Sequence, residues 1–166
     1  MAEQKHEILN SLYCVPSVRA DCYPIAENMR QPDIDEVKAF SGLSPMDAML
    51  NGFDATIMPI TIHSKEEGPC GMFGCCPSYR DGVSAATVWL LGTEAITKNS
   101  IRFLRESRYW LDTVTKDYDL VFNCIDKRNT VHIKWLQWLK FSLIREIPEF
   151  GVENRPFIEF VKVNYV

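Results

Sequence analysis

The chain has 166 residues, 46% of them hydrophobic and 24% charged, with a formal net charge of −4. This length supports one well-cored domain, and the composition excludes a largely disordered chain. The negative charge argues against a general nucleic-acid binder, because phosphate contacts need a cationic surface.

The six cysteines are irregularly spaced, and the densest group is Cys70, Cys75 and Cys76. That group contains no C-x-x-C pair, and adjacent thiols of a strand point to opposite faces, so no metal site is predicted. No apolar run is long enough to span a bilayer, and the polar first residues lack a signal-peptide hydrophobic region. We therefore expect a cytosolic protein whose cysteines are reduced and buried as small apolar side chains.

The first part of the chain predicts an arm followed by a single domain. Residues 1–17 are expected as an N-terminal arm or short helix with one apolar face, and residues 18–166 as the domain. A strand is expected over residues 18–26. Proline and acidic residues then predict helix starts for residues 31–40 and again for residues 44–52, where Ser44 is the expected N-cap.

Extended patterns follow these helices. Apolar runs at residues 55–63 and 70–76, joined by a charged Gly-Pro turn, predict a hairpin, and residues 77–82 a loop. The continuous apolar run 85–91, which ends at Gly92, predicts a buried central strand. The period then becomes helical up to Lys116. A helix that starts directly after a strand is a natural anion site, because its free N–H groups and its dipole point the same way.

The last third of the chain predicts one more strand-helix unit and two final strands. Residues 120–125 read as a buried strand and residues 130–140 as a helix for which Asn129 is the expected N-cap. Strands are expected at residues 142–146 and 157–165. The predicted order is strand, two helices, three strands, helix, strand, helix, two strands.

Residues 129–141 begin with asparagine and carry phenylalanine twelve residues later, and this frame resembles the N-x-x-A-x-x-(F/L)-Y-x-x-x-G-F segment of GNAT-type acyl-CoA N-acyltransferases. The predicted order of elements resembles the topology of that family. Short blocks of the sequence are similar to one branch of that family, the GNAT-like small internal virion protein family of short-tailed phages. The blocks that carry this second resemblance are residues 36–45, 72–74, 89–93, 103–105, 129–130, 133–141 and 155–157.

The resemblance implies an α+β fold with a mixed, mostly antiparallel, splayed sheet flanked by about four helices. It also implies acetyl-CoA or another acyl-CoA as the cofactor. The implied cofactor contacts are Leu90, Leu91, Gly92, Thr93, Thr97, Lys98, Asn99, Ser100 and Asn129.

The chain departs from the family pattern at two positions that matter for chemistry. The Q/R-x-x-G-x-G/A loop would fall on residues 95–100, where no glycine is present, and side chains there would crowd a pyrophosphate. The tyrosine that often protonates the leaving thiolate would fall at Leu136. The remaining candidates for catalysis are Glu94, the acid of the turn, and His132.

Two functions remain open on this basis. The first is a phage virion-associated or host-interaction protein on an acyltransferase scaffold with degenerate catalytic motifs, located in the virion or the host cytoplasm. The alternative is an active acetyl-CoA-dependent N-acetyltransferase that modifies a host or phage amine, using water or Glu94 in place of the tyrosine. The expected partner is a phage virion or host protein.

Overall fold

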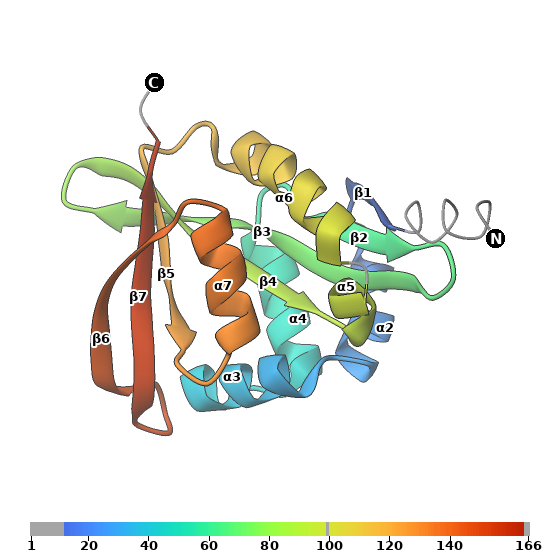
Figure 1. Cartoon of the computed structure of the whole chain (residues 1–166), viewed down its shortest axis with the longest axis horizontal. Helices are drawn as coiled ribbons and strands as arrows, with labels where there is room; N and C mark the ends of the chain where they lie inside the picture. The colour runs from blue at the N-terminus through green and yellow to red at the C-terminus, as the bar shows by residue number, and fades with distance from the viewer. Residues whose placement is uncertain (1–11, 99, 165–166) are drawn as a thin grey trace.

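Helices cover both faces of a seven-stranded sheet in the computed structural model, which describes residues 12–98 and 100–164, without the side chains of residues 100–102 (Figure 1). The strand order is β1-β2-β3-β4-β5-β7-β6. Every neighbouring pair is antiparallel except β4 and β5, which are parallel. The sheet is therefore mixed and mostly antiparallel, which confirms the predicted fold class.

The elements follow the predicted order, with two differences among the described helices. Cys22–Glu27 forms a helix before the first expected one, and the single helix expected between Gly92 and Lys116 is divided into Glu94–Lys98 and Ser100–Thr115. The strands are β1 (Leu12–Pro16), β2 (Ile60–Ser64), β3 (Gly68–Arg80), β4 (Val83–Gly92), β5 (Leu120–Asp126), β6 (Ser142–Phe150) and β7 (Arg155–Val163). The α-helices are α2 (Cys22–Glu27), α3 (Gln31–Ser41), α4 (Pro45–Ala55), α5 (Glu94–Lys98), α6 (Ser100–Thr115) and α7 (Thr130–Trp138), and the 3-10 turn η1 (Arg19–Asp21) precedes α2. No helix in the described part of the chain is long and apolar enough to cross a membrane.

The start of α4 confirms the predicted helix cap. The Ser44 hydroxyl accepts a hydrogen bond from the Asp47 backbone N–H at 3.1 Å. Pro45 occupies the first turn, where its missing N–H costs no hydrogen bond. The short loop between α3 and α4 therefore has the stop and start signals that the sequence predicts.

The strand expected over residues 18–26 is wrong, because this segment forms η1 and α2. Cys22, Ile25, Ala26 and Met29 are all buried, and their spacing of three, four and seven residues is helical. Asp21 starts the turn by accepting the Val18 N–H at 3.0 Å. The helical period was present in the sequence but lies in only six helical residues, too few to separate it from alternation.

The loop expected at residues 77–82 is also wrong, since β3 continues to Arg80. Pro77 lies opposite Ala86 of β4, whereas β2 ends opposite Phe73. The side of Pro77 that lacks an N–H therefore faces no strand, and the proline costs no ladder bond. The β3–β4 hairpin extends well beyond the rest of the sheet (Figure 1).

The segment expected as an N-terminal arm is only partly described. Residues 1–11 lie outside the described residues. Leu12–Pro16 forms β1, which pairs antiparallel with β2. The sheet thus begins within this segment.

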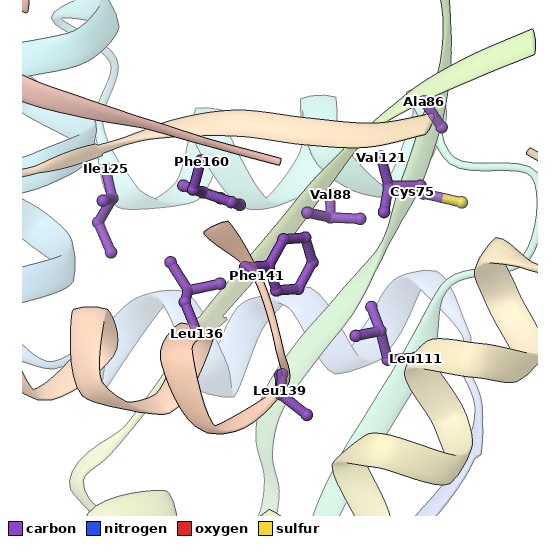
Figure 2. Packing of buried hydrophobic residues seen from close by; sticks show 10 residues of the cluster. All are labelled: Cys75, Ala86, Val88, Leu111, Val121, Ile125, Leu136, Leu139, Phe141 and Phe160. Carbon is purple, nitrogen blue, oxygen red and sulfur yellow. The ribbon is translucent and has the colours of Figure 1, made fainter. Parts of the chain in front are cut away.

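Two layers of helices bury opposite faces of the sheet. Buried side chains of α2 and α4 pack with Met72 of β3 and Leu91 of β4 on one face. On the other face α6 and α7 cover the centre of the sheet, where Figure 2 shows side chains from helices and strands converging on Phe141. Phe141 is 5% exposed and packs edge-on against Phe160 at 5.2 Å, as expected for the residue that closes the core after α7.

The two central parallel strands separate along their length. β4 and β5 pair only from Ala85 to Thr87 with Leu120 to Phe122, although β4 continues to Gly92 and β5 to Asp126. This divergence confirms the expected splay. It leaves the backbone of the second half of β4 without a neighbouring strand on the β5 side.

Candidate active site

A cavity of about 290 Å³ lies at the splay between β4 and β5. Its walls come from both faces of the sheet, with Glu36 and Phe40 of α3 on one side and Ser107 and Leu136 on the other. The cavity therefore lies between the helices of the two faces, at the level of the sheet. It is the concave, mostly apolar kind of site that binds small molecules.

The backbone of Leu90 faces this opening. Groups alternate sides along a strand, and the Thr93 N–H donates to Cys70 O at 2.8 Å on the β3 side. Gly92 N–H points the other way and donates to Asp33 Oδ2 at 3.0 Å. Leu90 repeats the direction of Gly92, and its N–H and C=O have no partner among the described residues. A buried backbone pair of this kind calls for a ligand or water.

One side chain spans the splay below Leu90. Asn123 of β5 donates through Nδ2 to Val88 O of β4 at 2.8 Å, in place of a ladder hydrogen bond. Asn123 lines the cavity. It marks the depth at which an extended ligand lying along β4 would end.

A second cavity of about 290 Å³ lies between α6 and α7 and beside the end of β4. It shares Leu90, His132 and Trp135 with the first cavity. Its cationic lining residues are Arg30 and Lys134. The two cavities are therefore adjacent, and together they make up the candidate site.

Aromatic contacts hold α6 and α7 beside this second cavity. Phe103 stacks on Trp135 at 5.3 Å between ring centroids, and Trp135 Nε1 donates to Ser107 Oγ at 3.2 Å. Arg108 lies over the Trp138 ring at 4.3 Å and donates to the Trp138 carbonyl at 3.0 Å. Arg108 is thus a link between helices.

The turn after β4 is helical and packed. Ile96 of α5 is 6% exposed, and its side chain lies against Gly71 and Gly92, where a Cβ on either glycine would meet it. Asp33 accepts the Gly92 N–H and pairs with Arg30 at 2.6 Å. Ile96, at a position predicted for the glycine loop, is therefore packed into the core, and Asp33 already occupies the Gly92 N–H.

The structure separates the sequence-predicted cofactor residues into three groups. Leu90 and Leu91 line the first cavity, and Gly92 and Thr97 line the second. Thr93 is buried and its hydroxyl accepts the Ala95 N–H, while Lys98 is exposed beside Glu67 at 3.9 Å. Asn99 lies outside the described residues, as does the side chain of Ser100.

Asn129 stands at the N-cap position of α7, as predicted, but its side chain is buried and makes no capping hydrogen bond. Its Nδ2 lies 3.4 Å from Asp33 Oδ1, 3.3 Å from Glu36 Oε2 and 3.4 Å from His132 Nδ1. Its Oδ1 is buried with no partner. Asn129 therefore links α3 to α7 beside the cavities.

The two predicted catalytic residues lie in different places. Glu94 is exposed at the start of α5 and lines neither cavity. His132 lines both, but burial lowers its pKa from 6.5 to about 4, so the imidazole is neutral at physiological pH. Leu136 is 3% exposed and lines the first cavity, and no described tyrosine lines either cavity.

Glu36 is the functional candidate that sequence reasoning missed. It is half-buried in the first cavity, and burial followed by the charge of Asp33 raises its pKa from 4.5 to about 8. One signal was available in the sequence: Glu36 lies within residues 36–45, one of the blocks that carry the resemblance. The burial that shifts its pKa was not, because it depends on the position of β5.

No family model matches the chain, and no curated protein matches it by sequence. Solved structures do. A GCN5-related N-acetyltransferase from Kribbella flavida is similar with a TM-score of 0.70 and 15% identity over 93% of this chain and 99% of that chain. An aminoglycoside N(6')-acetyltransferase from Legionella pneumophila gives 0.66 and 11% over 92% of each chain.

A spermidine N-acetyltransferase from Vibrio cholerae, solved in complex with CoA and spermine, is similar with a TM-score of 0.64 and 10% identity over 93% of this chain and 96% of that chain. The TM-scores show a shared architecture, while identities of 10–15% leave the chemistry to be argued from the site itself. The splayed parallel pair, the strand order and these neighbours agree. The chain has the GNAT acyltransferase fold.

Proposed function

We propose that this protein is an acyl-CoA-dependent N-acyltransferase that moves an acetyl or similar acyl group to an amine. The observation that carries the proposal is the cavity at the splay, onto which the unpartnered N–H and C=O of Leu90 open. A pantetheine arm adds to such a position like a strand and satisfies both groups. The neighbours that carry acetyltransferase names support the same function.

In this proposal the cofactor lies on the α6–α7 face. Leu90 and Leu91 contact the pantetheine, and Gly92 and Thr97 lie beside the pyrophosphate together with Arg30, which is already held near Thr97 at 3.5 Å. Lys98, Asn99 and Ser100 follow at the start of α6, where the dipole favours anions. When bound, the cofactor supplies the activated acyl thioester.

Titration calorimetry and thermal unfolding with acetyl-CoA test the proposal. Binding to the folded chain alone should stabilise it by about 2.7 kcal/mol at a hundredfold excess over Kd. That corresponds to a rise in Tm of about 5–10 °C. Release of CoA in the presence of an amine should then follow by chromatography. No saturable binding at millimolar acetyl-CoA would overturn the proposal.

A charge-reversal pair locates the anionic end of the cofactor. Lys98→Glu should weaken acetyl-CoA binding about tenfold, because it places a negative charge beside the helix start that holds the phosphates. Lys116→Glu, just beyond the other end of α6, is the matched control and should leave the affinity unchanged. Equal affinity of both variants would remove Lys98 from the site.

The second candidate is a virion-associated or host-interaction protein of a short-tailed phage that keeps this scaffold without catalysis. The specific observation in its favour is that Ile96, at a position predicted for the glycine loop, packs into the core, while Asp33 already occupies the Gly92 N–H. Detection of the protein in purified phage particles, or its capture with a host protein from infected cells, tests this function. Its absence from both, together with acetyl-CoA turnover, would exclude it.

A further inference from the structure

The wall of the first cavity that α3 and α4 contribute is apolar with one ionisable group. Phe40, Val37, Leu43 and Ala48 line it together with Ser41, and Glu36 is the only carboxylate among the described lining residues. The wall lies on the face opposite α6 and α7. A molecule that enters from this face therefore meets mostly hydrocarbon surface, the Ser41 side chain and a single acid.

The Glu36 carboxylate is oriented by two donors and keeps one oxygen free. Its Oε2 accepts the Asp126 N–H at 3.1 Å and the Asn129 amide at 3.3 Å. Its Oε1 has no partner among the described residues. Two fixed hydrogen bonds on one oxygen hold the side chain while the other oxygen remains available to a ligand.

Among the described residues, no cation pairs with Glu36. Of the two neighbouring carboxylates, Asp33 pairs with Arg30 at 2.6 Å and Asp126 pairs with Arg128 at 2.7 Å. The nearby His132 is neutral because burial lowers its pKa. Glu36 has a raised pKa of about 8, since burial and the charges of Asp33 and Asp126 outweigh its two hydrogen bonds. A cation brought by a ligand would relieve this cost.

We infer that the α3–α4 side of the cavity is the acceptor site for a single primary amine carried on an apolar group, with Glu36 as the base that takes its proton. This inference rests on the proposed function. A polyamine or an aminoglycoside brings several ammonium groups, and those beyond the first would lie against Val37, Phe40 and Leu43, which offer no counter-charge. The apolar wall instead rewards an alkyl or aryl substituent on the amine.

Glu36 takes the proton that the amine must lose before acyl transfer. The Glu36 carboxylate takes one proton from the incoming ammonium, and the freed nitrogen lone pair forms the C–N bond to the acyl carbon. The C–S bond breaks with its electron pair on sulfur, and the second nitrogen proton passes through water to that thiolate. The products are the amide, the free thiol and protonated Glu36, which returns its proton to solvent. A base whose pKa is near the working pH suits this exchange.

Glu36→Gln tests the role of the acid. The amide oxygen of glutamine still accepts both hydrogen bonds, so the fold and acetyl-CoA affinity should be unchanged. The turnover of phenethylamine should fall by about a hundredfold. The rise of kcat/KM with pH near 8 should disappear. Glu27→Gln, on the exposed surface of α2, is the matched control. Unchanged turnover and pH profile in Glu36→Gln would overturn the role of Glu36.

An amine panel tests the substrate class. The wild-type protein should use phenethylamine with a kcat/KM at least about tenfold above those for spermidine and kanamycin. Leu43→Asp adds a second carboxylate to the wall and should shift this preference toward spermidine. Preference of the wild-type protein for spermidine or kanamycin would overturn the assignment of an apolar monoamine.

The outcomes separate this inference from the proposed function. Absence of acetyl-CoA binding overturns both. Binding with CoA release to any amine upholds the proposed function, and the behaviour of Glu36→Gln and of the panel then decides the inference alone. Thermal unfolding of each variant beside the wild type excludes a loss of activity through misfolding.

Discussion

Glu36 shows how one residue acquires a property that its own sequence neighbourhood does not specify. It belongs to an ordinary helix, but α3 contacts β5, and Asp126 and Asn129 come from 90 and 93 residues away. Their packing removes water from the carboxylate, while Asp33 adds a like charge. The result is an acid that the folded state prefers to keep protonated well above pH 4.5.

This preference predicts a pH-dependent stability difference. The folded state binds more protons than the unfolded state between pH 4.5 and about 8, so the carboxyl lowers the free energy of unfolding as pH rises through that range. Glu36→Gln should therefore be more stable than the wild type at pH 8.5. We expect a gain on the order of 2 kcal/mol, below the full shift because water reaches part of the side chain.

Urea unfolding at pH 4 and pH 8.5 measures this difference. The two proteins should have nearly the same free energy of unfolding at pH 4, where the glutamate is mostly protonated in both states. Equal stability at pH 8.5 would show that Glu36 has an ordinary pKa.

Among the elements, β4 is paired along one edge and mostly unpaired along the other. Its β3 side is paired from Val83 to Gly92, whereas its β5 side is paired only from Ala85 to Thr87. The turn between β6 and β7 holds the end of α3. Val152 and Glu153 donate backbone hydrogen bonds to Phe40 O and Ala39 O. These contacts place α3 and its Glu36 over the splay.

A matched proline pair tests the two sides of β4. Leu90→Pro removes an N–H that the sheet does not use, so the protein should stay folded and lose acetyl-CoA affinity. Leu91→Pro removes an N–H on the β3 side and should unfold the protein or cost about 3 kcal/mol or more. Circular dichroism and calorimetry distinguish the two. Retained affinity in a folded Leu90→Pro would remove this N–H from the cofactor site.

A matched glycine pair tests the turn that holds α3. Gly151 has φ of +69°, and an added Cβ would meet the Ala39 carbonyl oxygen and lie 2.8 Å from Phe40 Cα. Gly82 has φ of +80° with nothing within 4 Å of such a Cβ. Gly82→Ala should cost about 1 kcal/mol from backbone strain alone. Gly151→Ala should cost roughly 3 kcal/mol because strain and overlap add. Similar losses in urea unfolding would show that the turn does not press on α3.

At the scale of the whole molecule, Asp33 joins three regions that are distant in sequence. It is 1% exposed, pairs with Arg30 before α3, accepts the Gly92 N–H at the end of β4 and lies 3.4 Å from Asn129 Nδ2. Asp33 lines the second cavity, and Glu36 of the same helix lines the first. The shape of the candidate site therefore depends on one buried carboxylate.

Loss of the Asp33 carboxylate should lower the free energy of unfolding of the whole protein. Asp33→Ala leaves the Arg30 guanidinium buried without a counter-charge and the Gly92 N–H without an acceptor, so we expect a loss of about 3–5 kcal/mol. Asp35→Ala, whose partner is the exposed side chain of Gln31, should change stability by less than about 0.5 kcal/mol. Thermal unfolding measures both. A small loss in Asp33→Ala would show that Arg30 finds another partner.

The sequence by itself determined the elements with strong local signals. The continuous apolar run of β4, the proline and serine at the start of α4, and the helical period of α6 each act within one element, where neighbouring residues decide the outcome. The resemblance in residues 129–141 and the order of elements led to the correct fold class. The short helix α2 and the extension of β3 to Arg80 were missed, because tertiary burial and a missing neighbour strand decide them.

Only the tertiary structure decided the candidate site. Glu94 and His132 have the chemistry of an acid and a base in isolation, but the fold exposes the first and buries the second as a neutral ring. Glu36 and the backbone of Leu90 are brought to the same cavity by the divergence of β4 from β5 and the docking of α3. The reason is physical: pKa values and unpaired backbone groups depend on which groups exclude water, and those groups lie far apart along the chain.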